Sequence, residues 1–279
     1  MYQYRRLLTL LLVLGCSEAF AQTLPTTQPN LLQIIREEVK IGHGADHTKT
    51  EAGWPAAFEK AKSPYFYLAL TSMTGTNEVW YVIPYESHTA MADEMKRSND
   101  DPVLAAELAR LSKVDAEHLT ATRTIQATAR KDLSRGDFPD TAKQRFYEVT
   151  IFRMRPGHES SFAAAAKSYG SAAGRSAPET NFRVYEVIAG MPGPTYLVFS
   201  SVPSFGQFDK MMSEGEATMK GFTEEEKAAF GKFNEGLVNS ESHRFRLDPE
   251  MSYVPTAVRA QDAAFWMPKK PAVRSSSQP

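Results

Sequence analysis

The sequence predicts an α+β fold in which one β-α-β-β-α-β unit occurs twice in tandem, and three observations predict it. The chain has 279 residues, of which 42% are hydrophobic and 23% charged, and this is an ordinary globular composition with enough apolar material for a buried core. Short motifs recur in the same order after 115–118 residues. Each copy alternates between stretches with strand character and stretches with helical spacing.

The internal repeat is visible in four pairs of matching segments. The first pair is Val39-Lys40-Ile41-Gly42-His43 with Met154-Arg155-Pro156-Gly157-His158, and the others are Met73-Thr74-Gly75 with Met191-Pro192-Gly193, Ser87 with Ser204, and Leu133-Ser134 with Met251-Ser252. Both the order and the spacing are kept. A period above one hundred residues is too long for a solenoid, so we infer one duplicated domain.

The elements of the first copy follow from apolar periodicity and turn residues. In order they are a strand at 31–39, a helix at 44–60, strands at 65–72 and 78–83, helices at 87–96 and 102–119, and a strand at 122–130. Gly75-Thr76-Asn77 joins the two middle strands in a hairpin. Pro55 removes a backbone donor from the first helix, which predicts a kink or a restart near Gly53.

The second copy repeats this order. Its elements are a strand at 146–154, a helix at 160–174, strands at 182–188 and 195–200, helical sequence at 205–239 with a helix beginning after Thr223, and a strand at 242–247. This is the split β-α-β unit of ferredoxin-like folds. A four-stranded sheet with helices on one face leaves its other face to be buried, so we expect the two sheets to pack into one barrel within the chain.

The N-terminal 21 residues predict a secretory signal peptide. Arg5 and Arg6 precede nine apolar residues, and Ala19-Phe20-Ala21 forms a cleavage site before Gln22. A membrane-spanning helix needs roughly 20 apolar residues, so no integral membrane span is expected here. We therefore expect export to the periplasm or the cell exterior. Lipoprotein processing at Cys16 is an alternative that the bulky Leu14 disfavours.

The remaining chain divides by composition. We expect a linker at 22–30, the first repeat at 31–134, a second linker at 135–144, the second repeat at 145–254 and a C-terminal tail at 255–279. The first linker and the tail are polar and rich in proline, so neither is expected to contribute to the core. Phe265-Trp266-Met267 in the tail could instead contact a partner protein.

Charge and cysteine content exclude several classes of function. The chain has 32 basic and 33 acidic residues, a net charge of −1, and no long basic run, which argues against a nucleic-acid partner. Cys16 is the only cysteine, so the predicted mature chain has no disulfide, thiolate metal site or cysteine nucleophile. Nucleotide-binding glycine motifs are absent from the sequence as well.

The first predicted helix carries the most informative side chains. At steps of three and four residues, His43, His47 and Trp54 share one face, and the matching position to His47 in the second copy is Phe162. Position 47 therefore points inward, and a histidine there has a pKa suited to general-base work. A buried histidine that is hydrogen-bonded to a neighbour is the alternative. If His47 acts chemically, His47→Phe should preserve folding and remove the activity.

A pocket is expected beneath the predicted kink. We expect His47 as candidate base, with Trp54, Tyr67, Trp80 and His43 as ligand-binding residues, although a filled aromatic core explains the same residues. The four alanines at 163–166 favour plain helix packing in the second copy, so the site is expected in the first. His43 and His47 have the i,i+4 spacing of metal ligands with Glu51 one turn further, but Gly44 would loosen this helix start, so no metal site is predicted.

The residues also resemble a known superfamily. A strand ending in Val39-Lys40-x-Gly42, a helix with Trp54, the Met73-Thr74-Gly75 hairpin and the strand Val79-Trp80-Tyr81 resemble the dimeric α/β-barrel superfamily, in particular its NIPSNAP-like and antibiotic-biosynthesis-monooxygenase-like members. The resemblance covers roughly 31–253 and implies two sheets paired in one barrel. It also implies a cofactor-free monooxygenase, in which a base ionises an aromatic substrate that then reacts with oxygen. Some relatives handle haem, but no residue here stands out as an axial ligand.

Three functions remain after these exclusions. The first is an exported barrel that binds a small apolar or aromatic ligand. The second is a cofactor-independent monooxygenase acting on an electron-rich aromatic substrate, with His47 as base. The third is a non-catalytic assembly or partner-binding protein, and the sequence leaves a homo-oligomer open. No cofactor is predicted for any of the three.

Overall fold

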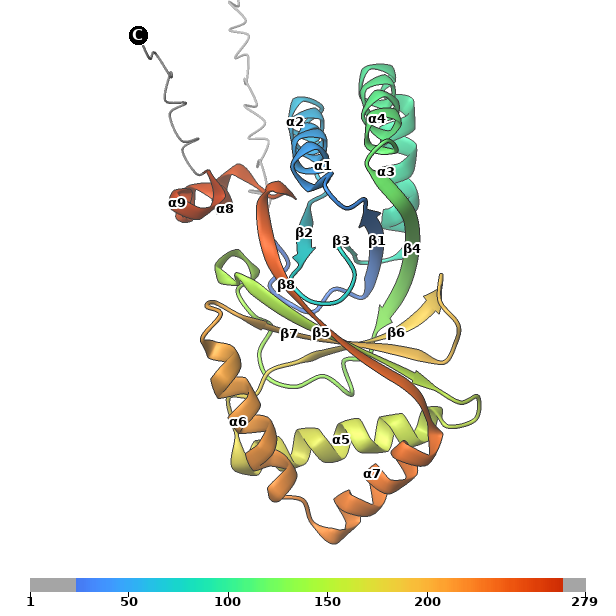
Figure 1. Ribbon diagram of the computed structural model, residues 1–279, viewed down its shortest axis with the longest axis vertical. Helices are drawn as coiled ribbons and strands as arrows, with labels where there is room; N and C mark the ends of the chain where they lie inside the picture. The colour runs from blue at the N-terminus through green and yellow to red at the C-terminus, as the bar shows by residue number, and fades with distance from the viewer. Residues whose placement is uncertain (1–23, 268–279) are drawn as a thin grey trace, which may run out of the picture.

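The protein forms a closed barrel of eight antiparallel strands with helices packed outside it (Figure 1). The structure is a computed structural model that describes residues 24–267, so the predicted signal peptide and the end of the predicted tail lie outside the described residues. The strands are β1 (Leu31–Val39), β2 (Tyr67–Ser72), β3 (Glu78–Tyr85), β4 (Leu119–Ala129), β5 (Phe146–Met154), β6 (Arg183–Ala189), β7 (Thr195–Val202) and β8 (Leu237–Tyr253).

The barrel confirms the predicted duplication and the predicted pairing of two sheets within one chain. Its strand order is β1-β3-β2-β8-β5-β7-β6-β4. Strands β4-β1-β3-β2 form the sheet of the first repeat, and β8-β5-β7-β6 form that of the second. The last strand of each repeat also pairs with the other repeat, β8 with β2 and β4 with β6, and these two seams close the barrel. Closure therefore pairs each of these eight strands with a neighbour on both sides.

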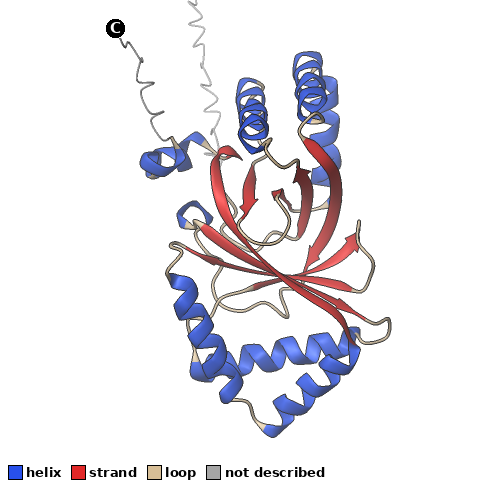
Figure 2. Cartoon of the chain, viewed as in Figure 1, coloured by secondary structure: helices blue, strands red, loops and turns tan. Residues whose placement is uncertain are grey.

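The helices lie on the outer faces of the two sheets, so one group covers each repeat (Figures 1 and 2). The first repeat carries α1 (Gly44–Glu51), α2 (Gly53–Lys60), α3 (His88–Asp100) and α4 (Pro102–Asp115), and the second carries α5 (Glu159–Ser176), α6 (Gln207–Lys220) and α7 (Glu224–Gly236). The start of α7 confirms the sequence prediction, since Thr223 caps it in a reciprocal capping box with Glu226.

The first predicted helix is interrupted where the sequence indicated. It divides into α1 and α2, with Ala52 between them, directly before Gly53 and Pro55. A Cβ on Gly53 would lie 2.6 Å from Leu111, so glycine allows α2 to approach α4 closely here. Gly42 and Gly157 have matching φ angles of +86° and +89° before α1 and α5, which confirms that the two helices start in equivalent turns.

The barrel interior is a continuous hydrophobic core. Alternate residues of the strands fill it, among them Ile34, Trp80, Leu197 and Phe245, all of which are buried. The residues between them face the helices and build separate outer clusters. Strands β2, β3, β5, β6 and β7 are therefore apolar on both faces, one toward the barrel interior and one toward the helices.

The expectation that the first linker and the tail stay out of the core is wrong. Leu24 belongs to the barrel core, and the tail folds into α8 (Thr256–Gln261) and α9 (Ala263–Trp266). Trp266 is buried and its indole N–H donates to the carbonyl of Ala142 at 3.2 Å, while the Arg145 guanidinium lies 3.7 Å from the ring centre of Phe265. Leu24 anchors the first linker, and Val258, Phe265 and Trp266 anchor the tail, so Phe265 and Trp266 pack on the chain itself.

Candidate functional site

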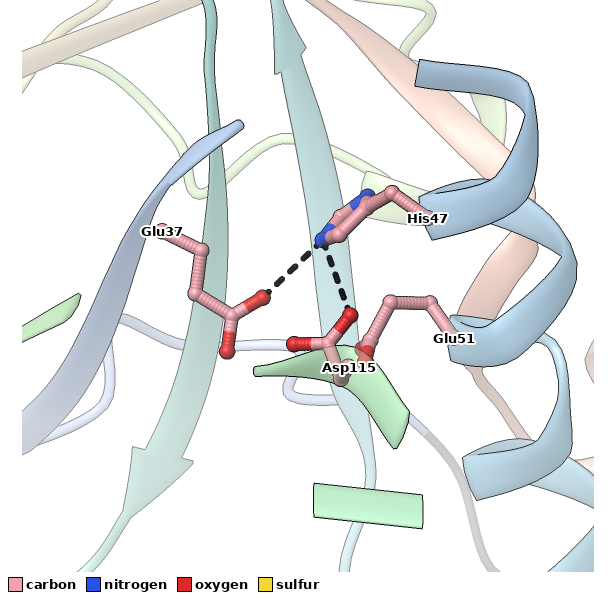
Figure 3. Close-up of side chains that lie close together, drawn as sticks. All are labelled: Glu37, His47, Glu51 and Asp115. Carbon is pink, nitrogen blue, oxygen red and sulfur yellow. Dashed lines mark hydrogen bonds and ion pairs between the residues drawn. The ribbon is translucent and has the colours of Figure 1, made fainter. Parts of the chain in front are cut away.

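Four ionisable side chains meet between α1, α4 and the outer face of the first sheet (Figure 3). His47 and Glu51 come from consecutive turns of α1, Glu37 from β1 and Asp115 from the end of α4. The Nε2 atom of His47 lies 3.2 Å from Oε2 of Glu37 and 3.7 Å from Oδ1 of Asp115. One oxygen of Glu51 completes a group of ligand-type atoms that lie within 4.8 Å of one another. We call these four residues the acidic cluster.

Burial dominates the electrostatics of the acidic cluster. His47 is 1% exposed, and Glu51 and Asp115 are each 4% exposed. Burial, together with the nearby charges of Glu37 and Asp115, raises the pKa of Glu51 to about 9. Burial and the Glu37 carboxylate also raise the pKa of Asp115, whereas the electrostatic effects of His47 and His118 lower it. Three carboxyl groups in this space are therefore costly to ionise together.

The acidic cluster also contains unpaired oxygen atoms. Oε1 of Glu51 and Oδ1 of Asp115 are buried without a hydrogen-bond partner. Within residues 24–267, no lysine or arginine forms an ion pair with Glu37, Glu51 or Asp115, and His47 is their basic neighbour. Buried polar atoms are normally satisfied, so a group with two orphaned carboxylate oxygens needs an explanation.

Only some of the other predicted site residues lie near the acidic cluster. His43 lies at the start of α1, where its Nδ1 is 3.1 Å from Nδ1 of His118, outside the acidic cluster. Trp54 packs with Phe58 and Leu111 between α2 and α4, and its side chain also lies close enough to Glu51 to lower the pKa of that carboxyl. Tyr67 does lie on the helix side of the sheet, near Glu51. Burial raises the pKa of the Tyr67 hydroxyl, and the charge of Glu51 raises it further.

The assignment of Trp80 to the same pocket is wrong. Trp80 belongs to the barrel core, whereas its neighbours Val79 and Tyr81 on β3 belong to the outer cluster with Tyr67. Successive side chains on a strand point to opposite faces. Trp80 and Tyr67 are therefore separated by the sheet, and a cavity lined by both does not form.

Sequence reasoning missed Glu37 and Asp115. The orientation of Glu37 could have been predicted from the alternation of side chains along the strand, since Ile35 and Val39 on either side of it also face the helices. Asp115 was harder to find, because its contact with His47 depends on how α4 packs against α1. The strand register identifies its counterpart in the second repeat. Val39 pairs with Leu119 in the first repeat as Met154 pairs with Leu237 in the second. Asp115 precedes Leu119 by the same number of residues as Phe233 precedes Leu237, so the two positions correspond.

The equivalent place in the second repeat is apolar. Phe152, Phe162 and Phe233 stand where the first repeat has Glu37, His47 and Asp115, and Ala166 stands in the place of Glu51. The three phenylalanine rings contact one another with centroids 5.6–6.2 Å apart. Phe162 also stacks on Tyr196 at 3.8 Å. The same fold position thus holds either an acidic or an aromatic group.

A cavity of about 570 Å³ adjoins these aromatic residues. It lies between α5, α6, α7 and the outer face of the second sheet, and we call it the second-repeat cavity. The expectation that α5 packs plainly on its sheet is therefore wrong: the small side chains of Ala165 and Ala166 line the cavity wall and leave room beside the phenylalanines.

Charged residues line part of the second-repeat cavity, and each has a partner. Lys210 bonds to Glu179 at 2.6 Å and lies 3.6 Å from Glu214. Glu148 accepts from Arg244 at 2.9 Å. The described lining therefore combines aromatic and methionine side chains with carboxylates already held by basic groups.

Comparisons with known proteins bear on the fold. No family model and no curated protein matches the chain. Among solved structures it is similar to candidate monooxygenases from Lactobacillus acidophilus (TM-score 0.51, 8% identity, covering 81% of this chain and 99% of that chain) and Fusobacterium nucleatum (TM-score 0.51, 11% identity, 78% and 92%). An uncharacterized NIPSNAP domain protein from Burkholderia xenovorans also matches over 34% of this chain and 90% of its own, at 17% identity and a TM-score of 0.28.

The likeness to the two candidate monooxygenases, at a TM-score of 0.51 each, confirms the fold that the sequence resemblance implied. The chain has the same barrel architecture, with both halves of the barrel supplied by one chain. At such identities the comparison concerns architecture alone, because one fold hosts many unrelated activities. Within residues 24–267, no helix is long and apolar enough to cross a bilayer.

Proposed function

We propose that this protein binds a small, largely apolar or aromatic molecule in the second-repeat cavity. The observation that carries the proposal is the cavity itself, since 570 Å³ lies within the range of about 300–1,000 Å³ found for small-molecule sites. The signal peptide expected at residues 1–21 would place this binding in the periplasm or outside the cell.

The lining supports a flat, aromatic ligand with one polar end. Phe152, Phe162 and Phe230 offer ring faces and edges, and Met211 offers an adaptable thioether. Lys210 and Asn181 are polar residues of the same lining, where they could hydrogen-bond a hydroxyl or a carboxylate. Lys210 is half exposed and already paired with Glu179. The polar end of a ligand would therefore replace Glu179 as the partner of Lys210.

Binding is better supported than oxygenase chemistry. A cofactor-free oxygenase needs a base in the same cavity as its substrate. His47 lies in the first repeat, and its counterpart beside the second-repeat cavity is Phe162, which cannot accept a proton. The carboxylates of the described lining are held by Lys210 and Arg244. Likeness to candidate monooxygenases keeps that activity as the alternative, and oxygen consumption with phenols and quinols would reveal it.

Filling the second-repeat cavity should block binding. Gly215 lies in α6 and lines the cavity, and a Cβ there would meet only the Tyr169 hydroxyl at an ordinary 3.6 Å. Gly215→Leu therefore places a branched side chain in the cavity, while replacement of a mid-helix glycine favours the helix by roughly 0.5–1 kcal/mol. We expect the affinity for the neutral fluorescent probe N-phenyl-1-naphthylamine to fall at least about tenfold, which corresponds to roughly 1.4 kcal/mol.

The matched control is Gly231→Leu. Gly231 lies in α7 and is exposed, and a Cβ there would point into open space. This variant gains the same side chain and the same helix propensity but should bind the probe as the wild type does. Equal affinity in the wild type and both variants, or no saturable binding in the wild type, would contradict the proposal.

A further inference from the structure

The acidic cluster of the first repeat has the donor set of a metal site. One imidazole nitrogen and three carboxylate groups converge from β1, α1 and α4, which are separate elements. Donor atoms bound at about 2.0–2.2 Å around one tetrahedral ion are about 3.3–3.6 Å apart. The distances from Nε2 of His47 to Glu37 and Asp115, 3.2 Å and 3.7 Å, bracket that spacing. All the donor atoms of the group lie within 4.8 Å of one another, so small side-chain movements would bring them to the distances that one ion requires.

Two buried oxygens of the acidic cluster are free to bind a cation. Oε1 of Glu51 and Oδ1 of Asp115 are buried without hydrogen-bond partners, and both residues are more than nine-tenths buried. Three carboxyl groups surround one imidazole, and no lysine or arginine within residues 24–267 forms an ion pair with any of them. A divalent ion would satisfy both oxygens and offset the charge, and buried charges are generally either paired or bound to metals.

The second repeat shows that the fold itself does not need these polar groups. At the equivalent positions, Phe152, Phe162, Phe233 and Ala166 occupy the same space between helices and sheet. An apolar set is therefore compatible with this architecture. A polar set of four at these positions is costly to bury and is explained if the first repeat binds something that the second does not.

We propose that Glu37, His47, Glu51 and Asp115 bind one divalent transition-metal ion, with Zn²⁺ and Mn²⁺ as the fitting class. Carboxylates suit Mn²⁺, and imidazole with carboxylates suits Zn²⁺. The site is closed by α1, α4 and the sheet, so its ion serves to hold the helices of the first repeat on their sheet. It is independent of the second-repeat cavity.

The test is a calorimetric titration of the full chain, stripped with a chelator, with ZnCl₂ or MnCl₂. We expect one ion per chain, and a melting temperature that rises by roughly 5–10 °C at metal concentrations about 100-fold above Kd. Glu37→Gln and Asp115→Asn keep the side-chain shape but remove a charged donor, and each should weaken binding at least about tenfold. Asp46→Asn removes an exposed carboxylate from α1, beside His47, and should leave the affinity unchanged.

Two further measurements separate loss of the site from loss of the fold. Circular dichroism and a cooperative thermal unfolding transition report whether each variant is folded. Pulsed electron paramagnetic resonance of the Mn²⁺ form should show a coupled nitrogen that disappears in His47→Gln. Failure of the wild type to bind either ion, or wild-type affinity in folded Glu37→Gln and Asp115→Asn, would overturn the proposal without affecting that of the second-repeat cavity.

Discussion

His47→Phe is expected to lower the free energy of unfolding of the metal-free protein by about 3–5 kcal/mol, the usual cost of removing one partner from a buried charged group. Phenylalanine cannot hydrogen-bond, so Glu37 and Asp115 would lose the ring nitrogen that lies 3.2 Å and 3.7 Å from their oxygens. The sequence alone suggests that a ring is accommodated here, because Phe162 occupies the matching position. That expectation overlooks the three carboxyl groups. Denaturant unfolding in the presence of a chelator measures the difference.

A multiple variant supplies the control. Replacing Glu37, His47 and Asp115 with phenylalanine and Glu51 with alanine imports the whole set of side chains from the second repeat. We expect this variant to recover most of the stability that His47→Phe loses, because no buried carboxylate remains unpaired. A loss below about 1 kcal/mol for His47→Phe would show instead that His47 does not stabilise these carboxylates.

Trp80→Ala is expected to cost about 3–5 kcal/mol of unfolding free energy, as large-to-small substitutions of buried tryptophan do. Trp80 is fully buried in the barrel, 5.0 Å from Phe245 between ring centroids, and the Arg36 guanidinium lies 4.5 Å from its ring centre. Arg36 is fixed in turn by a bidentate ion pair with the buried Glu78. The variant should therefore leave a void at the end of the core where this pair is anchored.

The same variant tests the corrected position of Trp80. Probe binding in the second-repeat cavity should be unchanged in Trp80→Ala under conditions in which the variant is folded, because Trp80 does not line that cavity. Met95→Ala is the control for stability, since Met95 is 60% exposed and its truncation should change stability by less than about 0.5 kcal/mol. A cost for Trp80→Ala close to that control would contradict a structural role in the core.

The fold was predictable because its signals are local or repeated. The hairpin turn at Gly75, the helix break near Pro55 and the matched turns at Gly42 and Gly157 can each be found within a few residues of sequence. The duplication then supplied both sheets of the barrel. By contrast, Leu24 lies in a short proline-rich segment and Trp266 in a short apolar run, and neither segment is long enough to show a period that would predict burial in the core.

The candidate sites were predictable only in part. His47 and Glu51 lie one turn apart on α1, so their spacing is visible, but Glu37 and Asp115 reach them through contacts between distant elements. The assignment of Trp80 failed because β3 is apolar on both faces, and alternation then gives no sign of which face points outward. The second-repeat cavity was missed because a run of alanines is typical of close packing, whereas here it leaves space beside Phe162.

Native mass spectrometry of the untagged full-length protein tests ligand binding in the second-repeat cavity most directly. Incubation with N-phenyl-1-naphthylamine should yield a complex with one probe molecule per chain, and the same complex should form with Gly231→Leu but be strongly reduced with Gly215→Leu. If a small organic molecule stays bound through purification, we expect it on the wild type and on Gly231→Leu and much less of it on Gly215→Leu. An unliganded wild type under these conditions, or a complex that survives undiminished in Gly215→Leu, would show that the second-repeat cavity is not the binding site.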